Sequence, residues 1–413
     1  MNGVPPQDVD ASVRPNLPPA WNCHGDSLLQ RAASIGKRIA VGAAERDLAV
    51  TIPHEEYRTI AASGLLAARV PAEFGGPEIS FADLARIFVH LGEGDPNLTQ
   101  AVLPHACLAD KLRIYGTRRQ QEKFYAEMLQ GRLITNANAE RGGKLGDIAT
   151  LVTEKNGEFR INGQKYYCTG SAFADGFFVL SATENGGRAY AIVPRDRAGL
   201  TVLDDWDGMG QRTTASGTVT LGDVVVHSEE LVRLEQFGIR STYEGAMAQL
   251  FHSAIDAGIA LAALGDAVAY GRNGARAVPE SGVAKAGDDP YVLHAVGEMA
   301  MNAHAAVALV ERAGGMLDLA VEAFFHHTSP RLPLAEASVA VAEAKMMAEH
   351  ASLHVSEMVF RVGGASATIR TRNLDRHWRN ARTHTTHDPV AYKAKIVGDF
   401  YMNDRPPPIS TKF

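Results

Sequence analysis

Residues 151–196, LVTEKNGEFRINGQKYYCTGSAFADGFFVLSATENGGRAYAIVPRD, differ in texture from the chain on both sides of them. Short runs of β-branched and aromatic residues are separated by Asn-Gly and Gly-Gly pairs, which are turn signals. The pair Asn156-Gly157 stands between two such runs and predicts a β-hairpin, because both positions of a tight hairpin turn favour a positive φ. The stretch SGTVTLGDVVVHSEEL, residues 216–231, continues the pattern. We therefore expect strands, and no helix, from about residue 133 to 232.

The sequence on both sides of this segment has helical periods. Before it, one helical stripe carries apolar residues, at Leu28, Leu29, Ala32, Ile35 and Ile39. The stretch SFADLARIFVHLGEGD, residues 80–95, opens with Ser80 three residues before Asp83, which predicts a helix start. After residue 240, long alanine-rich runs carry small residues on more than one face, which indicates helices buried on several sides in a bundle or a subunit interface.

The order of these textures predicts an α+β fold in three parts. We expect a loose N-terminal arm at 1–25, a helical domain at 26–132, a central β-barrel or sandwich domain at 133–235, and a C-terminal four-helix bundle with a tail at 236–413. A chain of 413 residues is long enough for two or three such units.

The composition narrows the class of protein. Apolar residues make up 46% of the chain, and the formal net charge is −6, so nucleic-acid binding is not expected. No apolar run is long enough for a transmembrane helix, and the polar, proline-rich N-terminus lacks the apolar core of a signal peptide. Three distant cysteines, Cys23, Cys107 and Cys168, fit a reducing cytoplasm better than a disulfide framework.

Two asparagines mark the point where the first helices meet the strands. The stretch TNANAERGG, residues 135–143, holds Asn136 and Asn138, whose carboxamides can both donate and accept hydrogen bonds. The overlapping ERGGKLGD, residues 140–147, has three glycines that suit a mobile loop over a pocket. The alternative is a plain connection made of turn residues.

The strand end YYCTGS, residues 166–171, offers a second polar position. Thr169 can present a hydroxyl and a backbone N–H beside a turn at Gly170, although an ordinary edge threonine is the alternative. Cys168 alternates to the other face of the strand and is predicted to be a core residue rather than a nucleophile. Trp206, in DDWDGMGQR at 204–212, either walls an apolar pocket or fills a satellite core.

Two arginines stand in the stretch AYGRNGAR, residues 269–276. Arg272 and Arg276 are four residues apart, which predicts that they share one helical face. A guanidinium is a good phosphate ligand, and a solvated helix end is the alternative.

The stretch RNARTHTTHDPVAYKAK, residues 379–395, holds two histidines three residues apart, His384 and His387. A zinc site needs a third ligand. His377 lies seven residues back, but no cysteine or acidic residue stands at motif spacing, so no metal is expected. Imidazole titrates near neutrality and can donate or accept a proton at pH 7, which leaves acid–base roles or solvated surface positions.

Five segments carry a resemblance to a known family: TNANAERGG (135–143), YYCTGSAFAD (166–175), DDWDGMGQR (204–212), RVGGASA (361–367) and DRHWRNARTHTTHDPVAYK (375–393). With the order of the three parts, they resemble the flavin-dependent monooxygenases of the acyl-CoA dehydrogenase fold, in particular the dibenzothiophene monooxygenase type and related FMNH2-dependent organosulfur monooxygenases. The likeness covers about residues 26 to 410.

The resemblance implies roles for individual residues. It places His387, Thr169 and Asn136 at the active site, with Thr169 near flavin N5 and His384 in a supporting or exposed position. It implies that Arg276 binds the flavin phosphate and that Ala365 and Ser366 reach the cofactor from a neighbouring subunit. The cofactor contacts that it implies are Asn136, Asn138, Glu140, Arg141, Tyr167, Cys168, Thr169, Arg276, Ala365, Ser366 and His387.

The resemblance also implies a reaction. A separate NAD(P)H:flavin reductase would supply FMNH2, with FAD as a possible substitute, to a cytoplasmic homotetramer. Dioxygen would react at the flavin to give a C4a-(hydro)peroxide, and oxygen would pass to an organosulfur compound. An acyl-CoA dehydrogenase would instead need a carboxylate base. The stretch TYEG at 242–245 lies too early in the chain for that role, and RNARTHTTHD stands in the expected place.

The substrate side departs from the family's pattern. Where the aromatic-sulfur enzymes have a histidine and a tyrosine, LTQAVLPHACLAD at 98–110 has Gln100 and Pro104, followed by His105. We therefore expect a small alkyl sulfur substrate, such as a sulfinate, sulfone or sulfide, bound by Trp206, His105 and Pro104. Three alternatives stay open: an N- or phenol hydroxylase of the same fold, an FAD-containing dehydrogenase-like enzyme, and a member of the fold without enzymatic activity.

Overall fold

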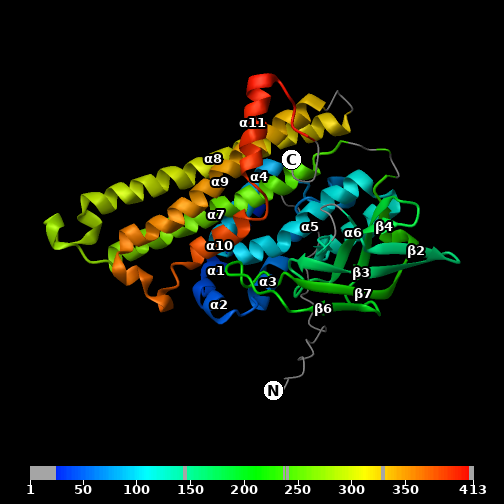
Figure 1. The fold of residues 1–413 in the computed structure, drawn as a ribbon, viewed down its shortest axis with the longest axis horizontal. Coiled ribbons are helices and arrows are strands. Elements are labelled where there is room, and N and C mark those ends of the chain that lie inside the picture. Colours follow the sequence, from blue (N-terminus) through cyan, green and yellow to red (C-terminus); the bar gives the residue numbers. More distant parts are fainter. Residues whose placement is uncertain (1–24, 143–146, 236–237, 239–240, 327–330, 409–413) are drawn as a thin grey trace, which may run out of the picture.

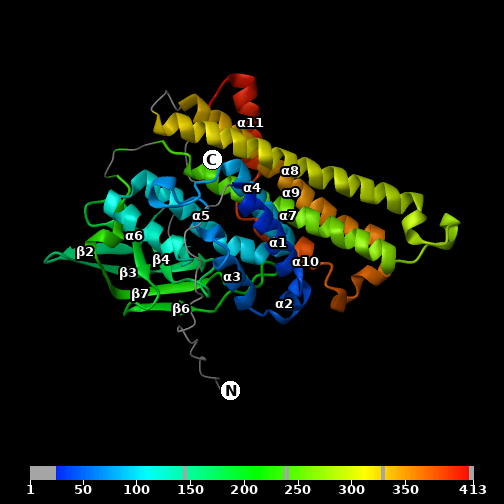
Figure 2. The ribbon, with the colours of Figure 1, turned by 180° about the vertical axis from the view of Figure 1, so that it is seen from behind.

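The computed structural model describes residues 25–142, 147–235, 238, 241–326 and 331–408. The predicted N-terminal arm and most of the predicted glycine loop (143–146) therefore lie outside the described residues. Figures 1 and 2 show an elongated molecule with a β-sheet at one end, long helices reaching to the other end, and the N-terminal helices between them. The predicted order of helices, strands and helices is confirmed, while the proposed domain boundaries stay predictions.

The N-terminal helices begin where the sequence places capping residues. The side chain of Ser80 accepts a hydrogen bond from Asp83 N at the start of α4, as predicted, and Asp95 does the same for Asn97 N at the start of α5. The helices of this part are α1 (Gly25–Ala40), α2 (Ala43–Ala49), α3 (His54–Ala61), α4 (Phe81–Gly94), α5 (Pro96–Tyr115) and α6 (Arg118–Leu129), with short 3₁₀ turns at Leu65–Ala67 and Ala72–Phe74.

The central segment forms an eight-stranded mixed sheet in the order β6-β7-β3-β2-β4-β5-β8, with β1 parallel to β4. Its strands are β1 (Ile134–Ala137), β2 (Leu151–Lys155), β3 (Glu158–Cys168), β4 (Gly176–Thr183), β5 (Arg188–Pro194), β6 (Leu200–Leu203), β7 (Gly217–Val226) and β8 (Leu231–Arg233). The predicted hairpin joins β2 and β3, and Asn156 and Gly157 both have a positive φ. Near its end β3 slips in register against β7, between Lys165 and Cys168.

Three long helices form the body of the C-terminal part, α7 (Glu244–Asn273), α8 (Pro290–Phe325) and α9 (Arg331–Gly363), followed by α10 (Arg376–Thr385) and α11 (Ala391–Asn403). Short 3₁₀ turns lie at Pro279–Ser281, Ala286–Asp288, Ala365–Thr368 and Arg370–Arg372, and another, Ser228–Glu230, precedes β8. Helix α4 packs against α7 so closely that a Cβ on Gly258 would lie 2.6 Å from Glu93 N. By length and composition α7 could span a membrane, but 78% of its most apolar window is buried, as in a core helix.

Candidate functional site

The turn after β3 rests directly on α5 and brings the predicted active-site strand against the helices. Gly170 has a φ of +80°, and a Cβ there would lie 2.5 Å from Ala101 O. Gly170 N also donates to Thr214 O at 2.9 Å. Only a glycine fits this contact. Thr169 is therefore held beside the part of α5 that carries Gln100, whose side chain reaches His384 on α10, 3.1 Å from Nε2.

Asn136 lies in β1, and Asn138 follows directly after the strand ends at Ala137. Both Oδ1 atoms are buried, and neither has a hydrogen-bond partner among the residues that the structure describes. The neighbouring Thr135 donates to Thr169 O at 2.5 Å, which joins the two strand ends. A buried acceptor without a partner is costly, so two such acceptors two residues apart would suit a ligand that brings a hydrogen-bond donor. The pyrimidine edge of a flavin ring carries such an N–H donor, so these residues fit that group.

The hydroxyl of Thr169 belongs to a chain of hydroxyls with one direction. Thr214 Oγ1 donates to Gln211 O at 2.9 Å, so its only proton is used. Ser216 Oγ, 2.8 Å away, must then donate to Thr214, and Thr169 Oγ1 must donate to Ser216 at 2.9 Å. Toward any ligand, Thr169 Oγ1 consequently offers lone pairs only.

Two aromatic rings and an arginine lie near the end of β3, close to Thr169 in the sequence or in space. Tyr167 has a φ of +56° where β3 slips in register, and its side chain is half-exposed. Its ring meets Trp206 edge to face with centroids 6.2 Å apart, and Arg141 lies 5.3 Å from its ring centre. Trp206 Nε1 donates to Gln211 O, which fixes the indole near the hydroxyl chain. These three predicted residues are thus brought together.

Two side chains predicted to contact the cofactor, those of Glu140 and Cys168, are occupied inside the protein instead, which corrects their assignment. Both carboxylate oxygens of Glu140 are used by Lys165, Ala149 N and Thr150 N. Burial opposes these contacts, yet they lower the pKa of Glu140 to about 2. Cys168 is buried in the core of the sheet, as its alternation predicts, so its thiol does not face a ligand. Burial raises the pKa of that thiol to about 12.

The prediction that His105 binds substrate is wrong. It is buried in α5, and its two ring nitrogens contact Leu66 O and Ile134 N. Burial lowers its pKa to about 4 despite these two bonds, so the ring stays neutral and ties α5 to β1. Pro104 is buried in the interior of the same helix. It shapes α5 rather than offering a polar contact.

The two histidines of α10 and the following turn have different surroundings. His384 is buried, with Nδ1 2.6 Å from Asp256 Oδ1 and Nε2 2.9 Å from His252 Nδ1. The exposed alternative is therefore wrong, and the supporting role stays a prediction. The side chain of His387 is 48% exposed, and its Nδ1 lies 3.1 Å from Asp388 Oδ2. Its ring packs on that of His252, with centroids 4.4 Å apart.

Four residues behind this pair were not predicted. Gln249, His252 and Asp256 lie on one face of α7, and Lys345 of α9 forms a fully buried ion pair with Asp256 at 2.6 Å. Gln249 Nε2 donates to Asp388 Oδ2 at 2.5 Å. A sequence signal existed, because polar residues at i, i+3 and i+7 interrupt an apolar helix. Among the described residues, no cluster of histidine, cysteine and acidic side chains could hold a metal ion.

The predicted phosphate ligands lie elsewhere. Helix α7 ends at Asn273, so Arg276 stands in the next loop. The prediction that Arg276 shares a helical face with Arg272 is therefore wrong. Arg276 lines a cavity of about 450 Å³ with Gly363 and Gly364, next to Ala365 and Ser366. This loop and the end of α9 lie at the end of the long helices remote from the sheet (Figures 1 and 2). Within one chain they do not join the group around Thr169.

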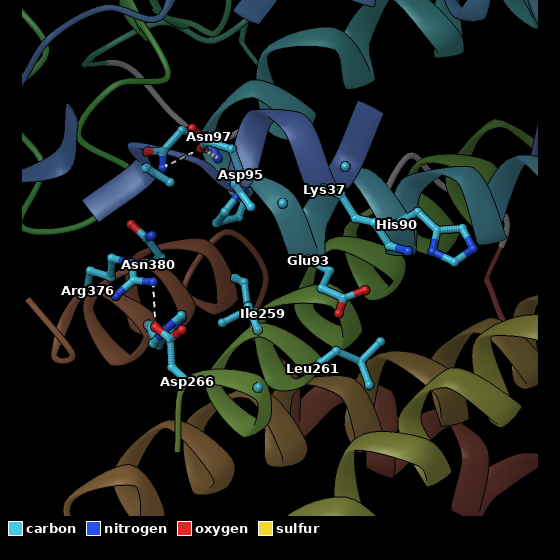
Figure 3. Close-up of a pocket in the computed structure, with 18 of the residues that line it drawn as sticks. Lys37, His90, Glu93, Asp95, Asn97, Ile259, Leu261, Asp266, Arg376 and Asn380 are labelled. Atoms are coloured by element: carbon cyan, nitrogen blue, oxygen red, sulfur yellow. Dashed lines mark hydrogen bonds and ion pairs between the residues drawn. The ribbon is translucent and has the colours of Figure 1, made fainter. Parts of the chain in front are cut away.

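A separate cavity of about 410 Å³ opens among α1, α4, α5, α7 and α10. Figure 3 shows Asn97 and Asp95 on one side of it and Arg376 and Asp266 on another. The ion pair between Arg376 and Asp266 (2.6 Å) and the Asp95–Asn97 bonds already occupy much of its polar lining. The cavity is lined by none of the predicted catalytic residues. It lies one helical turn from Gln100 and His384, since Asn97 precedes Gln100 on α5 and Asn380 precedes His384 on α10.

Comparisons with known proteins give a consistent result. The acyl-CoA dehydrogenase N-terminal, middle and C-terminal domain models match residues 30–132, 134–224 and 250–391. Dibenzothiophene monooxygenase of Rhodococcus erythropolis is 30% identical over 390 residues, which cover 91% of this chain and 93% of that protein. The probable FMNH2-dependent monooxygenase SfnC of Pseudomonas putida is 29% identical over 384 residues, covering 91% and 95%.

Solved structures agree with these relatives. FMN-bound TdsC from Paenibacillus sp. A11-2 superposes with a TM-score of 0.86 at 30% identity, covering 94% of this chain and 100% of that one. Methanesulfinate monooxygenase MsuC from Pseudomonas fluorescens gives a TM-score of 0.84 at 29% identity, covering 93% and 99%.

Proposed function

Because this chain belongs to the acyl-CoA dehydrogenase family, in its branch of FMN-dependent monooxygenases, we propose that it oxygenates a small alkyl organosulfur compound. For a sulfinate, the overall reaction would be R–SO2⁻ + O2 + FMNH2 → R–SO3⁻ + H2O + FMN. One oxygen atom goes to sulfur and the other to water, and reduced flavin supplies both electrons. A cytoplasmic NAD(P)H:flavin reductase would provide FMNH2.

The observation that carries the proposal is the imidazole at the turn between α10 and α11. His387 is half-exposed there, while the carboxylates around it are already engaged: Asp256 by Lys345 and His384, and Asp388 by Gln249 and by His387 itself. Glu244 of the TYEG stretch is held by Lys111 and Tyr115. A dehydrogenase needs a carboxylate free to abstract a proton, whereas an oxygenase needs a group that exchanges a proton near pH 7.

The residues around Thr169 would hold the cofactor, which supplies the electrons that activate dioxygen. Asn136 and Asn138 offer unpaired oxygens to the ring's N–H group, and Thr169 accepts a further hydrogen bond. Tyr167, Trp206 and Arg141 form a wall that limits access of water. His387 would hold and return a proton beside the reacting sulfur. Arg276, Ala365 and Ser366 would come from a neighbouring subunit.

The small-substrate proposal rests on Gln100 and Pro104. Gln100 Oε1 lies 3.1 Å from His384 Nε2, and Pro104 is buried within α5, so this side presents an amide rather than an aromatic ring. An amide N–H suits a charged sulfinate, and stacking on a tricyclic thiophene would need a ring.

The test supplies reduced FMN from a separate flavin reductase in the presence of ¹⁸O2. We expect methanesulfinate to give sulfonate that carries one ¹⁸O atom, with much lower turnover of dibenzothiophene, measured by mass spectrometry. His387→Gln should lower kcat by about 10²-fold or more, whereas His354→Gln, a partly exposed histidine of α9, should retain activity. Preferred oxygenation of an amine or a phenol would replace the sulfur proposal by the hydroxylase alternative.

A further inference from the structure

A buried polar chain runs from α9 through α7 to α10 behind the exposed imidazole of His387. Lys345 Nζ lies 2.6 Å from Asp256 Oδ2, and Asp256 Oδ1 lies 2.6 Å from His384 Nδ1. His384 Nε2 lies 2.9 Å from His252 Nδ1. The side chains of Lys345 and Asp256 are fully buried. Such a chain in the centre of a bundle is costly unless every member is paired.

The charge state of Asp256 follows from its partners. Burial alone would raise the pKa of this carboxyl, but Lys345 and His384 overcome that effect and lower it. Asp256 is therefore ionised and can only accept hydrogen bonds. His384 must carry its proton on Nδ1 to make the 2.6 Å contact.

The second nitrogen of His384 fixes the next ring. Burial lowers the pKa of His384, so the ring is neutral and its Nε2 carries a lone pair. The donor for that lone pair is the Nδ1–H of His252, which leaves the Nε2 of His252 as an acceptor. Gln100 Oε1 also lies 3.1 Å from the Nε2 of His384. That nitrogen could donate to this oxygen only if His384 carried a second proton, which the neutral ring lacks. The chain thus has one direction, with donors pointing from His252 to His384 to Asp256.

The ring of His252 connects this buried polar chain to the exposed histidine, His387. Its ring packs on that of His387 with a centroid distance of 4.4 Å and a tilt of 31°. Burial and the neighbouring rings of His387 and His384 lower the pKa of His252 well below its usual value. A neutral ring with a fixed acceptor therefore lies against His387.

We propose that Asp256 is a positioning residue that, paired with Lys345, fixes His384 and His252 as Nδ1-protonated neutral tautomers and thereby orients His387. The part concerning His387 rests on the proposed function, but the tautomers do not. The charged or titratable groups that form or face this buried polar chain come from three helices and the turn that follows. They are Asp256 and His252 of α7, Lys345 and Glu349 of α9, His384 of α10, and His387 and Asp388 after α10. The same principle operates where a buried aspartate orients the histidine of a serine protease.

The first test needs no flavin. We expect the ¹⁵N spectrum of [¹⁵N]histidine-labelled protein, recorded from pH 6 to 8, to show protonated Nδ1 and unprotonated Nε2 for His252 and His384. Signals are assigned by their loss in His252→Gln and His384→Gln. An unprotonated Nδ1 on either ring in the wild-type protein would overturn the proposal. This readout decides the proposal even if no sulfur compound is oxygenated, which would refute only the proposed function.

The second test removes the aspartate without leaving a buried charge. Asp256→Asn alone strands Lys345 and can prevent folding, so the variant is Asp256→Asn with Lys345→Met. We expect mixed tautomers at His384 and kcat lower by about 10²-fold with KM changed by less than about threefold. Glu244→Gln with Lys111→Met, which removes another largely buried ion pair of α7 in the same way, should keep the tautomers and kcat. Wild-type tautomers in the double variant would overturn the proposal, whatever its activity.

Discussion

The direction of a single hydroxyl decides what Thr169 can do for a cofactor. Its proton is donated to Ser216, whose own proton goes to Thr214, which donates to the backbone of Gln211. In oxidised flavin N5 is a hydrogen-bond acceptor, and in reduced flavin it carries a hydrogen. If Thr169 faces N5, as proposed, its lone pairs favour the reduced form. This would suit an enzyme that receives FMNH2 from another protein.

Ser216→Ala removes the acceptor that holds the proton of Thr169. The freed hydroxyl can then donate to oxidised flavin, so we expect oxidised FMN to bind up to about tenfold more tightly, the worth of one hydrogen bond. Quenching of FMN fluorescence measures this affinity. Ser171→Ala is the matched control, because Ser171 donates to Ala215 O in the same turn and does not touch Thr169. Equal oxidised-FMN affinities in both variants and the wild type would contradict the direction of the chain.

Sequence reasoning identified the two histidines, and the resemblance gave them different roles, but it could not decide whether His384 is buried or exposed. Two residues three apart at a helix end lie on one face of the helix. Whether each side chain is buried depends on contacts with α7 and α5, which lie far away in the sequence. For the same reason His105 was misassigned. Its neighbours in space, Leu66 and Ile134, are 39 and 29 residues away. Asn136 and Thr169 were easier to place, since each ends a strand with clear alternation.

At the scale of elements, local signals predicted what local physics controls. The Asn156-Gly157 hairpin and the Ser80 cap follow from φ preferences and side-chain hydrogen bonds within a few residues. The end of α7 at Asn273 was missed because Gly274 can continue or end a helix. The polar face of α7 was also missed, since its partners Lys345 and His384 come from other helices.

The contact between the β3 turn and α5 predicts a large effect of one methyl group. Gly170→Ala would put a Cβ 2.5 Å from Ala101 O at a φ of +80°. We expect a loss of about 2–4 kcal/mol in the free energy of unfolding, because backbone strain and a steric overlap add. Thr169 would shift with the turn, so FMN binding should weaken as well. Denaturant unfolding and FMN titration measure the two effects.

Gly186→Ala is the control for this prediction. Gly186 has a similar φ of +77°, but a Cβ there meets nothing within 4 Å. It should therefore lose only the strain term, about 1–2 kcal/mol, and keep its affinity for FMN. Equal losses of stability in the two variants would mean that the contact with α5 adds nothing beyond the strain.

At the scale of the whole molecule, the single chain leaves large apolar side chains uncovered. The outer helices α8 and α11 expose Tyr291, Leu293, Met301, Leu319, Tyr401 and Met402. Exposed apolar groups of this size indicate contacts with another protein surface. The cavity with Arg276, Gly363 and Gly364 lies where α8 begins and α9 ends, at the end of these helices remote from the sheet. Both features fit the proposed homotetramer, in which one subunit completes the cofactor site of another.

Subunit complementation tests whether sites are shared. Arg276→Ala and His387→Ala should each be nearly inactive alone. If Arg276 serves a neighbour, co-expression of the two variants creates some sites with His387 from one chain and Arg276 from the other. For random pairing of equal amounts, about a quarter of the sites are intact, so activity should recover to about that fraction. If Arg276 acts within its own chain, every chain carries a defective site, and the mixture should stay as inactive as the separate variants.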